Sequence, residues 1–336
     1  MRVSPFRALL VAFLACLALA QAAAAASPAK LLAKHQPVTV FTPLESFRPT
    51  SVETFVADSN LEALTGPNIL TDWTVVNPAP QPGSLPSSSP TLLRLNQRTC
   101  SPALGLVGLA CYASSWSAHA APNLVYGRVV TAGDKIVLQY WYFYYDNFYS
   151  YENPPSDFIW QAHEGDWEVV NVVLSADDDE PLFVGYSQHC LGETRSWAQV
   201  PRWRGRHPIV YVAFGSHANY FAPGTHPFDT RCIPPQALSI LQQLGLALPV
   251  DYTGDGPRSG PERLPGDATA IVRVAEASPG WVAFPGFWGE LQFFKSPVPL
   301  PGSPTGIVPL GTSPVGPAFH AVWQAPLATL ATWPDG

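Results

Sequence analysis

The sequence has few charged residues, and it lacks several patterns that mark well-known protein classes. Charged residues make up 13% of the 336 positions, whereas 47% are hydrophobic and 12% aromatic, so the chain can bury a substantial core. Apart from one apolar stretch at the start, no long uncharged run could span a bilayer. The C-x-x-C spacing of zinc sites, the metalloprotease pattern H-E-x-x-H and the serine-hydrolase pattern G-x-S-x-G are all absent.

The N-terminal residues have the layout of a secretory signal peptide. Arg2 and Arg7 precede an apolar run at 8–20, and small residues suited to cleavage follow this run. The run is too short to span a bilayer comfortably. We therefore expect residues 1–26 to be removed and residues 27–336 to form a single secreted domain with no transmembrane span.

The mature chain is mildly acidic. Without the first 26 residues it retains 16 basic and 25 acidic residues, so its formal charge is −9 instead of −7. A negative protein is repelled by nucleic acid and by anionic lipid surfaces. We therefore expect no nucleic-acid partner and no simple electrostatic docking on a membrane.

Four cysteines remain after the signal peptide, namely Cys100, Cys111, Cys190 and Cys232. An even number of cysteines in an exported chain predicts disulfides, and four cysteines allow three pairings. We favour Cys100–Cys111 and Cys190–Cys232, because the first pair brackets one short loop.

The hydrophobic pattern favours an all-β fold, specifically a β-sandwich with a few short helices. Strands are expected at 136–144, 166–174, 181–189 and 207–214. Many short strands, few helical patterns and abundant Pro and Gly are typical of this architecture.

Two helices and two long irregular segments are also expected. Helices are expected at 51–60, where Ser51 can cap the N-terminus, and at 235–248. The Pro/Ser-rich residues 77–99 should form a loop, and the Pro/Gly-rich segment 296–317 should wrap the surface.

The stretch from His163 to Glu168 is short, polar and dense in metal-binding side chains. In a strand that begins at Asp166, the carboxylates of Asp166 and Glu168 share one face and repel each other. A bound divalent cation would remove this conflict. A straight strand would point His163 to the other face, but Gly165 can supply a bend that turns it back. One imidazole and two carboxylates suit Mg, Ca or Mn.

The aromatic segment 145–151 carries Asn, Asp and Ser between its rings. This pattern predicts a loop with exposed aromatic side chains. We expect Tyr145, Phe148 and Tyr149 to contact a sugar or a membrane interface.

Several motifs occur in an order that is similar to one known family. They are Pro37-Val-Thr-Val-Phe, Glu45-x-Phe-Arg-Pro, Tyr140-Trp-Tyr-Phe-Tyr-Tyr, His163-Glu-Gly-Asp-Trp-Glu, His207-Pro-Ile-Val-Tyr-Val-Ala, Gly215-Ser-His-Ala and Phe284-Pro-Gly-Phe-Trp-Gly. Together they resemble the Vps62-like family over about residues 35–325. The resemblance implies a fold and a type of domain, and it implies little about activity.

A second, more distant resemblance is to the necrosis- and ethylene-inducing-like proteins, which are secreted cytolysins of a β-sandwich type. Their heptapeptide Gly-His-Arg-His-Asp-Trp-Glu lines a divalent-metal site, and its His-x-x-Asp-x-Glu spacing is kept by His163, Asp166 and Glu168. The chain departs from it where Glu164 replaces the arginine and Gly165 replaces the second histidine.

The same resemblance implies two further site residues. An acidic metal ligand upstream of the heptapeptide has Asp157 as its first candidate here and Asp146 as its second. A Ser-His motif on a later strand resembles Ser216-His217.

The leading hypothesis is a secreted, divalent-metal-binding β-sandwich protein that contacts an extracellular glycan or lipid headgroup, with a cytolysin-like action implied by the distant resemblance. The alternative is a metal-dependent hydrolase, in which Glu164 or His217 acts as general base. In a third, purely structural interpretation, Asp166 and Glu168 anchor arginines or backbone amides, and the protein is a wall or surface adhesion module. The available arginines are Arg128, Arg202, Arg204 and Arg206.

Overall fold

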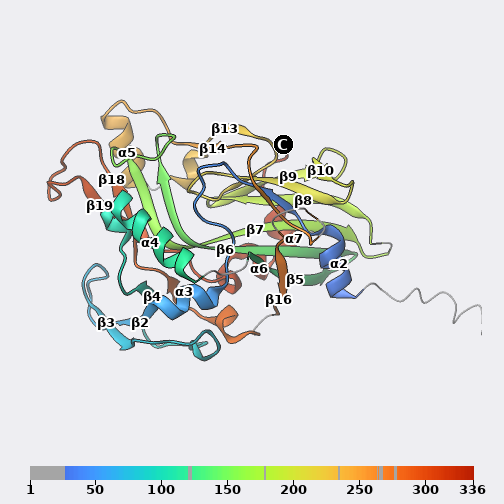
Figure 1. The fold of residues 1–336 in the computed structure, drawn as a ribbon, viewed down its shortest axis with the longest axis horizontal. Helices are drawn as coiled ribbons and strands as arrows, with labels where there is room; N and C mark the ends of the chain where they lie inside the picture. Colours follow the sequence, from blue (N-terminus) through green and yellow to red (C-terminus); the bar gives the residue numbers. More distant parts are fainter. Residues whose placement is uncertain are drawn as a thin grey trace, which may run out of the picture.

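The computed structural model describes residues 27–336 except 120–122, 178, 234, 263, 265–267 and 276–277. The signal peptide expected at 1–26 therefore lies outside the described residues. Most of the described secondary structure is β, in sheets of eight, five, four and two strands (Figure 1). The predicted all-β fold with a few short helices is confirmed.

The eight-stranded sheet has the order β16-β5-β6-β7-β18-β19, with β8 also paired to β7 and β9 to β8. Its strands are β5 (Leu124–Ala132), β6 (Lys135–Ser150), β7 (Trp160–Ser175), β8 (Pro181–Gln188), β9 (Leu191–Ser196), β16 (Ala270–Arg273), β18 (Leu291–Lys295) and β19 (Ile307–Thr312). The long antiparallel pair β6–β7 forms its centre.

The remaining strands form three smaller sheets. The five-stranded sheet contains β1 (Val38–Val40), β10 (Arg202–Trp203), β11 (His207–Val212), β12 (Asn219–Tyr220) and β15 (Arg258–Ser259). The four-stranded sheet contains β2 (Ser59–Leu64), β3 (Trp73–Asn77), β4 (Leu93–Gln97) and β17 (Phe287–Trp288). The two-stranded sheet pairs β13 (Gly224–Pro227) with β14 (Val250–Thr253).

Short helices lie around these sheets. They are α2 (Pro28–His35), α3 (Val52–Asp58), α4 (Leu106–Ala118), α5 (Pro235–Gln243), α6 (Ala321–Gln324) and α7 (Pro326–Leu330). The predicted helix at 51–60 is α3, and the Ser51 side chain accepts a hydrogen bond from Thr54 N as expected of its cap. The second predicted helix is α5, which ends at Gln243 because the chain turns at Gly245 with φ +64°.

The β6–β7 pair is buried on both faces, so the eight-stranded sheet is the middle layer of the molecule. On one face, Phe143 packs against Trp167 and against Trp288 of the four-stranded sheet, with ring centroids 4.8 and 5.3 Å apart. On the other face, Tyr144 stacks on His217, which lies between β11 and β12 of the five-stranded sheet. In Figure 1, β6 and β7 cross the centre and β2–β4 lie below them.

The predicted aromatic loop at 145–151 is wrong, because β6 continues to Ser150. Tyr145, Phe148 and Tyr149 are at most 3% exposed, so none of them can be a surface contact. Each ring has an internal partner. The Tyr145 hydroxyl donates to Asp58, the Tyr149 hydroxyl donates to Val250 O, and Phe148 stacks on Trp160.

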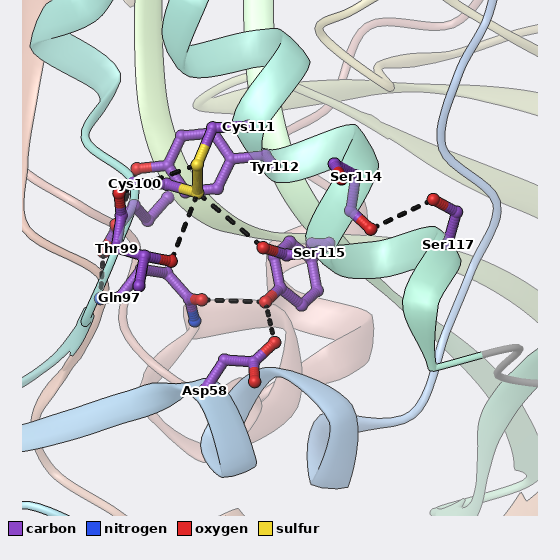
Figure 2. The surroundings of a disulfide bond; sticks show 11 residues. Asp58, Gln97, Thr99, Cys100, Cys111, Tyr112, Ser114, Ser115 and Ser117 are labelled. Carbon is purple, nitrogen blue, oxygen red and sulfur yellow. Dashed lines mark hydrogen bonds between the residues drawn. A yellow bond between two sulfur atoms is a disulfide. The ribbon is translucent and has the colours of Figure 1, made fainter.

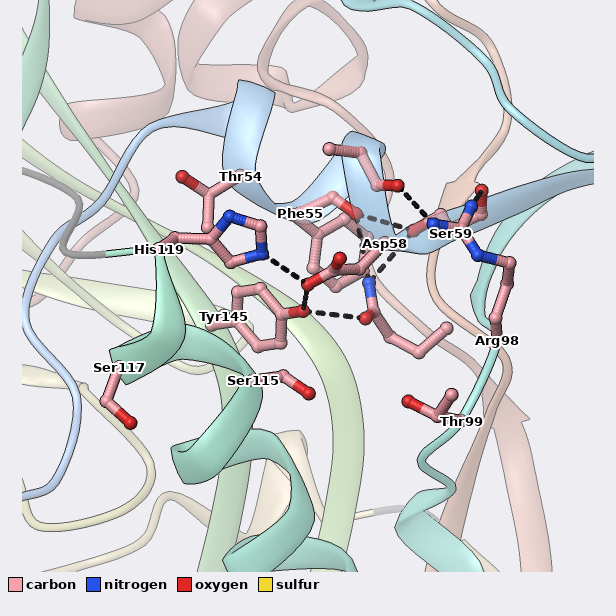
Figure 3. Close-up of polar contacts among 12 residues, drawn as sticks. Thr54, Phe55, Asp58, Ser59, Arg98, Thr99, Ser115, Ser117, His119 and Tyr145 are labelled. Atoms are coloured by element: carbon pink, nitrogen blue, oxygen red, sulfur yellow. Dashed lines mark hydrogen bonds and ion pairs between the residues drawn. The ribbon is translucent and has the colours of Figure 1, made fainter.

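Figure 3 shows how the polar end of Tyr145 is satisfied inside the protein. Its hydroxyl also lies 2.8 Å from Gln97 Oε1, and Asp58 Oδ2 is 2.8 Å from His119 Nε2. This network joins α3, β4, β6 and the end of α4. A polar group that is fully hydrogen-bonded can be buried at little cost, which is why a polar-aromatic pattern did not mean a loop here.

The two segments predicted as loops each contain a strand. Residues 77–99 contain β4 near their end, and Leu93 and Leu95 of this strand are buried. Segment 296–317 contains β19, which pairs antiparallel with β18. β19 is at the edge of its sheet, whereas β4 pairs with β17 on one side and with β2 on the other. Strand formation in both depends on pairing and packing more than on intrinsic β-propensity.

Both favoured disulfides form. Cys100–Cys111 joins the segment after β4 to α4, and its surroundings include Ser115 (Figure 2). Cys190–Cys232 joins the β8–β9 turn to the segment before α5. Over the part of the chain that the structure describes, no helix is both long enough and apolar enough to cross a membrane.

Candidate functional site

Strand β7 places the predicted metal-binding residues on one cavity of about 350 Å³. His163, Asp166 and Glu168 all line it. In an uninterrupted strand, His163 would face away from the other two. Gly165 has φ +55°, which interrupts the alternation and brings His163 to the same side. The bend expected at this glycine is confirmed.

The bend is fixed by close packing. A Cβ atom on Gly165 would lie 2.3 Å from the backbone oxygen of Trp288. The Trp288 side chain is fully buried. Only glycine fits this point, because it combines a left-handed backbone with the absence of a side chain.

His217 is the positive partner of the cavity's carboxylates. Its Nδ1 lies 3.0 Å from Asp166 Oδ2, and its Nε2 lies 3.7 Å from Glu45 Oε1. The ring is fully buried and stacks on Tyr144 at 3.9 Å, nearly parallel. Its backbone has φ +57°, an unusual conformation for a residue other than glycine.

These contacts decide the charge of the imidazole. Burial alone would lower the pKa of His217, but the Glu45 charge and the hydrogen bond to Asp166 outweigh burial and raise it to about 9. The same contacts lower the pKa of Asp166 and of Glu45 against the opposite effect of burial. At neutral pH an imidazolium therefore lies between two carboxylates.

Two further acids near this centre have raised pKa values. Burial, and then the charge of Asp166, hold the pKa of Glu168 well above its usual range, although Ser187 donates a hydrogen bond to it. Both carboxyl oxygens of Asp146 are buried without a hydrogen-bond partner among the described residues, and burial followed by the Glu164 charge raises its pKa. Both environments favour the protonated acid over the carboxylate, and a cation beside either group would oppose this effect.

His163 is prepared to act as a neutral ligand. Its Nδ1 lies 2.9 Å from the backbone oxygen of Gly165, so Nδ1 carries the proton that is donated and Nε2 keeps its lone pair. Burial lowers the pKa of His163, which keeps the ring neutral. A histidine that donates its other nitrogen to a carbonyl is the usual arrangement of a metal ligand.

Two predicted site residues lie elsewhere. Glu164 faces the opposite side of the sheet, where it accepts hydrogen bonds from the Tyr112 hydroxyl and the backbone amides of Gln97 and Glu290. This follows from the bend at Gly165, which sends Glu164 away from the cavity. Its assignment as general base at this site is therefore wrong.

Asp157 is also in the wrong place for the site. Its carboxylate accepts a hydrogen bond from Leu106 N at the start of α4. It precedes β7, and the strand from Trp160 to Asp166 alone spans roughly 20 Å at the usual rise per residue. Asp146, the second candidate, pairs with Glu164 across β6–β7. The residue that pairs with His163 is the next one, Asn147.

The arginines of the structural interpretation lie elsewhere, and two of them, Arg204 and Arg206, border a different cavity. Arg128 donates to Gln139 and to Trp323 O, and Arg202 donates to Trp197 O. The resemblance had indicated His217 as a site residue, but neither its ion pair with Asp166 nor its second partner, Glu45, was predicted. Glu45 belongs to one of the recognised motifs. It accepts a hydrogen bond from the Gly215 amide, which is 170 residues away in the chain, and local sequence patterns do not predict contacts at such separations.

The donor chemistry fits a hard divalent cation, but not a closed protein cage. Among the described residues, no group of three or more His, Cys, Asp or Glu side chains is arranged to hold a metal ion. Magnesium, however, commonly keeps several waters and binds through only one or two carboxylates. Asp166 and Glu168 are the two carboxylates that line this cavity, and His163 lines it beside them.

No protein-family model matches the chain. The chain is distantly similar to the vacuolar protein sorting-associated protein TDA6 of Saccharomyces cerevisiae, which is related to Vps62, with 25% identity over 238 residues. The match covers 62% of this chain and 46% of the relative, so the chain spans about half the length of the curated relative it matches.

Solved structures of necrosis- and ethylene-inducing proteins are also similar. Necrosis and Ethylene inducing Protein 2 from the causal agent of cocoa's Witches Broom disease is 16% identical, with a TM-score of 0.29, over 57% of this chain and 67% of that chain. NLPPya in complex with glucosamine is 20% identical, with a TM-score of 0.25, over 30% of this chain and 46% of that chain. NLPPya in complex with mannosamine is 19% identical, with a TM-score of 0.23, over 30% and 45%. Both likenesses inferred from the motifs are thus found.

Proposed function

We propose that this chain is a secreted β-module that binds a hydrated divalent cation, Mg, Ca or Mn, and through it an extracellular glycan or lipid headgroup. Asp166 and Glu168 would hold the ion, with His163 Nε2 beside it. The observation that carries the proposal is the bend at Gly165, which gathers these three side chains on one cavity. The two disulfides agree with folding in an oxidising, secretory compartment.

Charge supports cation binding at this point. A carboxyl group whose pKa is raised by burial and by a negative neighbour is stabilised in its charged form by a nearby cation. Glu168 is in this position beside Asp166. Binding would therefore release a proton, and affinity would rise with pH.

The coordination positions that the protein leaves to water would bind the extracellular ligand. A cation held by two carboxylates keeps waters that the hydroxyls of a sugar or a headgroup can replace. The cavity wall also carries the partly exposed ring of Phe228. Aromatic rings beside polar ligands are a common way to bind sugars.

A hydrolase is less well supported. One candidate base, Glu164, faces the other side of the sheet. The other, His217, is an imidazolium at neutral pH with a pKa of about 9, so it has no lone pair for a proton. Cytolysis would be a consequence of headgroup binding, and vesicle leakage in the presence of the cation would test it.

The first test compares melting temperatures with Ca, Mg or Mn and with EDTA. We expect the cation to raise the melting temperature, since a ligand at about 100 times its dissociation constant adds about 2.7 kcal/mol of stability. In Glu168→Gln the melting temperature without a cation should stay unchanged, because glutamine resembles the protonated acid, whereas the cation-induced rise should disappear.

Asp177→Asn is the matched control, because Asp177 is exposed in the turn after β7. It should keep the full rise. Glucosamine and mannosamine, the sugars in the NLPPya complexes, serve as glycan probes with and without the cation. Equal melting temperatures in EDTA and in each divalent ion would contradict the proposal.

A further inference from the structure

A second cavity, of about 610 Å³, is lined by cationic side chains. It is bounded by α2, by the turn between β10 and β11, and by β16. Its lining residues include Lys34, Arg204, Arg206 and Arg273, together with Trp203 and His207. In Figure 1, α2 and β10 lie at the right of the molecule, whereas β18, β19 and α5 lie at the left.

The charge of this cavity is opposite to that of the whole protein. Among the residues that the structure describes, four cations from three separate elements line it, against one carboxylate, that of Glu262. None of the ion pairs found between described residues involves Lys34, Arg206 or Arg273. In a chain with more acids than bases, such a concentration of unmatched cations indicates a site for an anion.

Neighbouring groups respond to this positive charge. The pKa of His35, at the end of α2, is lowered to about 4 by burial and then by the charge of Lys34. Burial, and after it the charges of Arg206 and Arg204, lower the pKa of His207. A bound anion would relieve this repulsion.

The cavity also has a rigid polar lining. His207 Nδ1 donates to Gln36 O at 2.8 Å, and Gln36 Nε2 donates to Thr269 O at 2.7 Å. These bonds fix the His207 ring and leave Nε2 as its remaining polar atom. Trp203 supplies an aromatic surface and holds Arg204 over its ring at 4.3 Å.

We propose that this cavity binds a phosphate-bearing ligand. A phosphate monoester carries up to two negative charges and presents three oxygens to guanidinium groups, whereas a carboxylate carries one charge. The volume exceeds that of phosphate alone and is typical of a small-molecule site. The phosphate could belong to a lipid headgroup or to a soluble compound. The site is separate from the acidic cavity and does not depend on the function proposed for it.

Calorimetric titration tests this with two probes, inorganic phosphate and phosphatidylcholine vesicles with or without phosphatidic acid. We expect the double variant Arg206→Gln/Arg273→Gln to bind phosphate at least about tenfold more weakly, since a charged hydrogen bond contributes roughly 1.5–3 kcal/mol. Both arginines are exposed, so the variant should fold. The NMR signals of the His207 ring should move on titration, and those of His119 should not.

The control is Arg231→Gln/Arg258→Gln, which removes two exposed arginines that pair with Asp229 and Asp255. It should bind like the unmodified chain. Preferential binding of the phosphatidic acid vesicles would identify a headgroup, and binding of inorganic phosphate alone would identify a soluble ligand. Absence of binding to both probes, or equal weakening in both double variants, would overturn the proposal.

Discussion

Gly165→Ala is expected to lower the free energy of unfolding by about 3 kcal/mol or more. A left-handed backbone costs an L-residue roughly 1–2 kcal/mol, and Gly165 has φ +55°. The new methyl group would also lie 2.3 Å from Trp288 O. Backbone cannot move aside as a flexible side chain can, and overpacking in a tight core typically costs about 1–3 kcal/mol.

Trp288 has little freedom to relieve the contact. Its ring packs against Phe143 and Trp167, with centroids 5.3 Å away in both cases. Denaturant unfolding followed by tryptophan fluorescence would measure the loss. Gly311→Ala in β19 is the control, because a Cβ there meets nothing within 4 Å and its φ is not positive. Similar stabilities of the two variants would contradict the packing argument.

The same substitution should weaken the cation effect. If β7 straightens, the side chains before residue 165 exchange faces, and His163 leaves the cavity. The cation-induced rise in melting temperature should therefore be smaller in Gly165→Ala than in Gly311→Ala, at temperatures where both variants are folded.

The sequence predicted the parts of the fold that local patterns determine. β-Branched and aromatic alternation placed β6 and β7, and the spacing around Gly165 predicted the bend that unites His163 with Asp166. The failures have physical reasons. Segment 145–151, which has polar residues between its aromatic rings, is predicted to be a loop but forms the end of a strand. The hydrogen bonds that satisfy Tyr145 and Tyr149 come from segments distant in sequence, so the local pattern does not reveal them.

The site was predictable only in part for a similar reason. Acidic residues were recognised from their order in the chain, but their cationic partner comes from a separate sheet. His217 was noted only as part of a Ser-His motif, and nothing near it in sequence indicates its contacts with Asp166 and Glu45. Likewise, α4 was not predicted, since its residues are apolar around most of the helix and lack a clear periodic face.

Stability should fall between about pH 6.5 and pH 9 because of His217. Its pKa is about 6.5 in the unfolded chain and about 9 in the folded protein. The stabilisation is thus complete below pH 6.5 and is lost as pH rises through 9, and it amounts to about 3 kcal/mol. Asp166 and Glu45, whose folded pKa values are lowered, act in the other direction and lose their contribution in acid.

His217→Asn isolates this contribution. At pH 6 the variant should be less stable by about 3–5 kcal/mol, because removing one partner of a buried ion pair leaves uncompensated charge on Asp166 and Glu45. At pH 10 the difference should shrink, since the unmodified imidazole is then neutral as well. Glu168 and Asp146, whose pKa values are raised, also favour lower pH, so the measured quantity is the difference between the two proteins at each pH.

His226→Asn is the matched control for loss of an aromatic stack. His226 stacks on Tyr220 at 3.9 Å, as His217 does on Tyr144, but its nearest polar partner is the Thr253 hydroxyl. This variant should keep the fall in stability between pH 6.5 and 9, because the His217 ion pairs remain. A fall of the same size in His217→Asn would show that other groups cause the pH dependence, and His217 would then be a neutral, merely stacked ring.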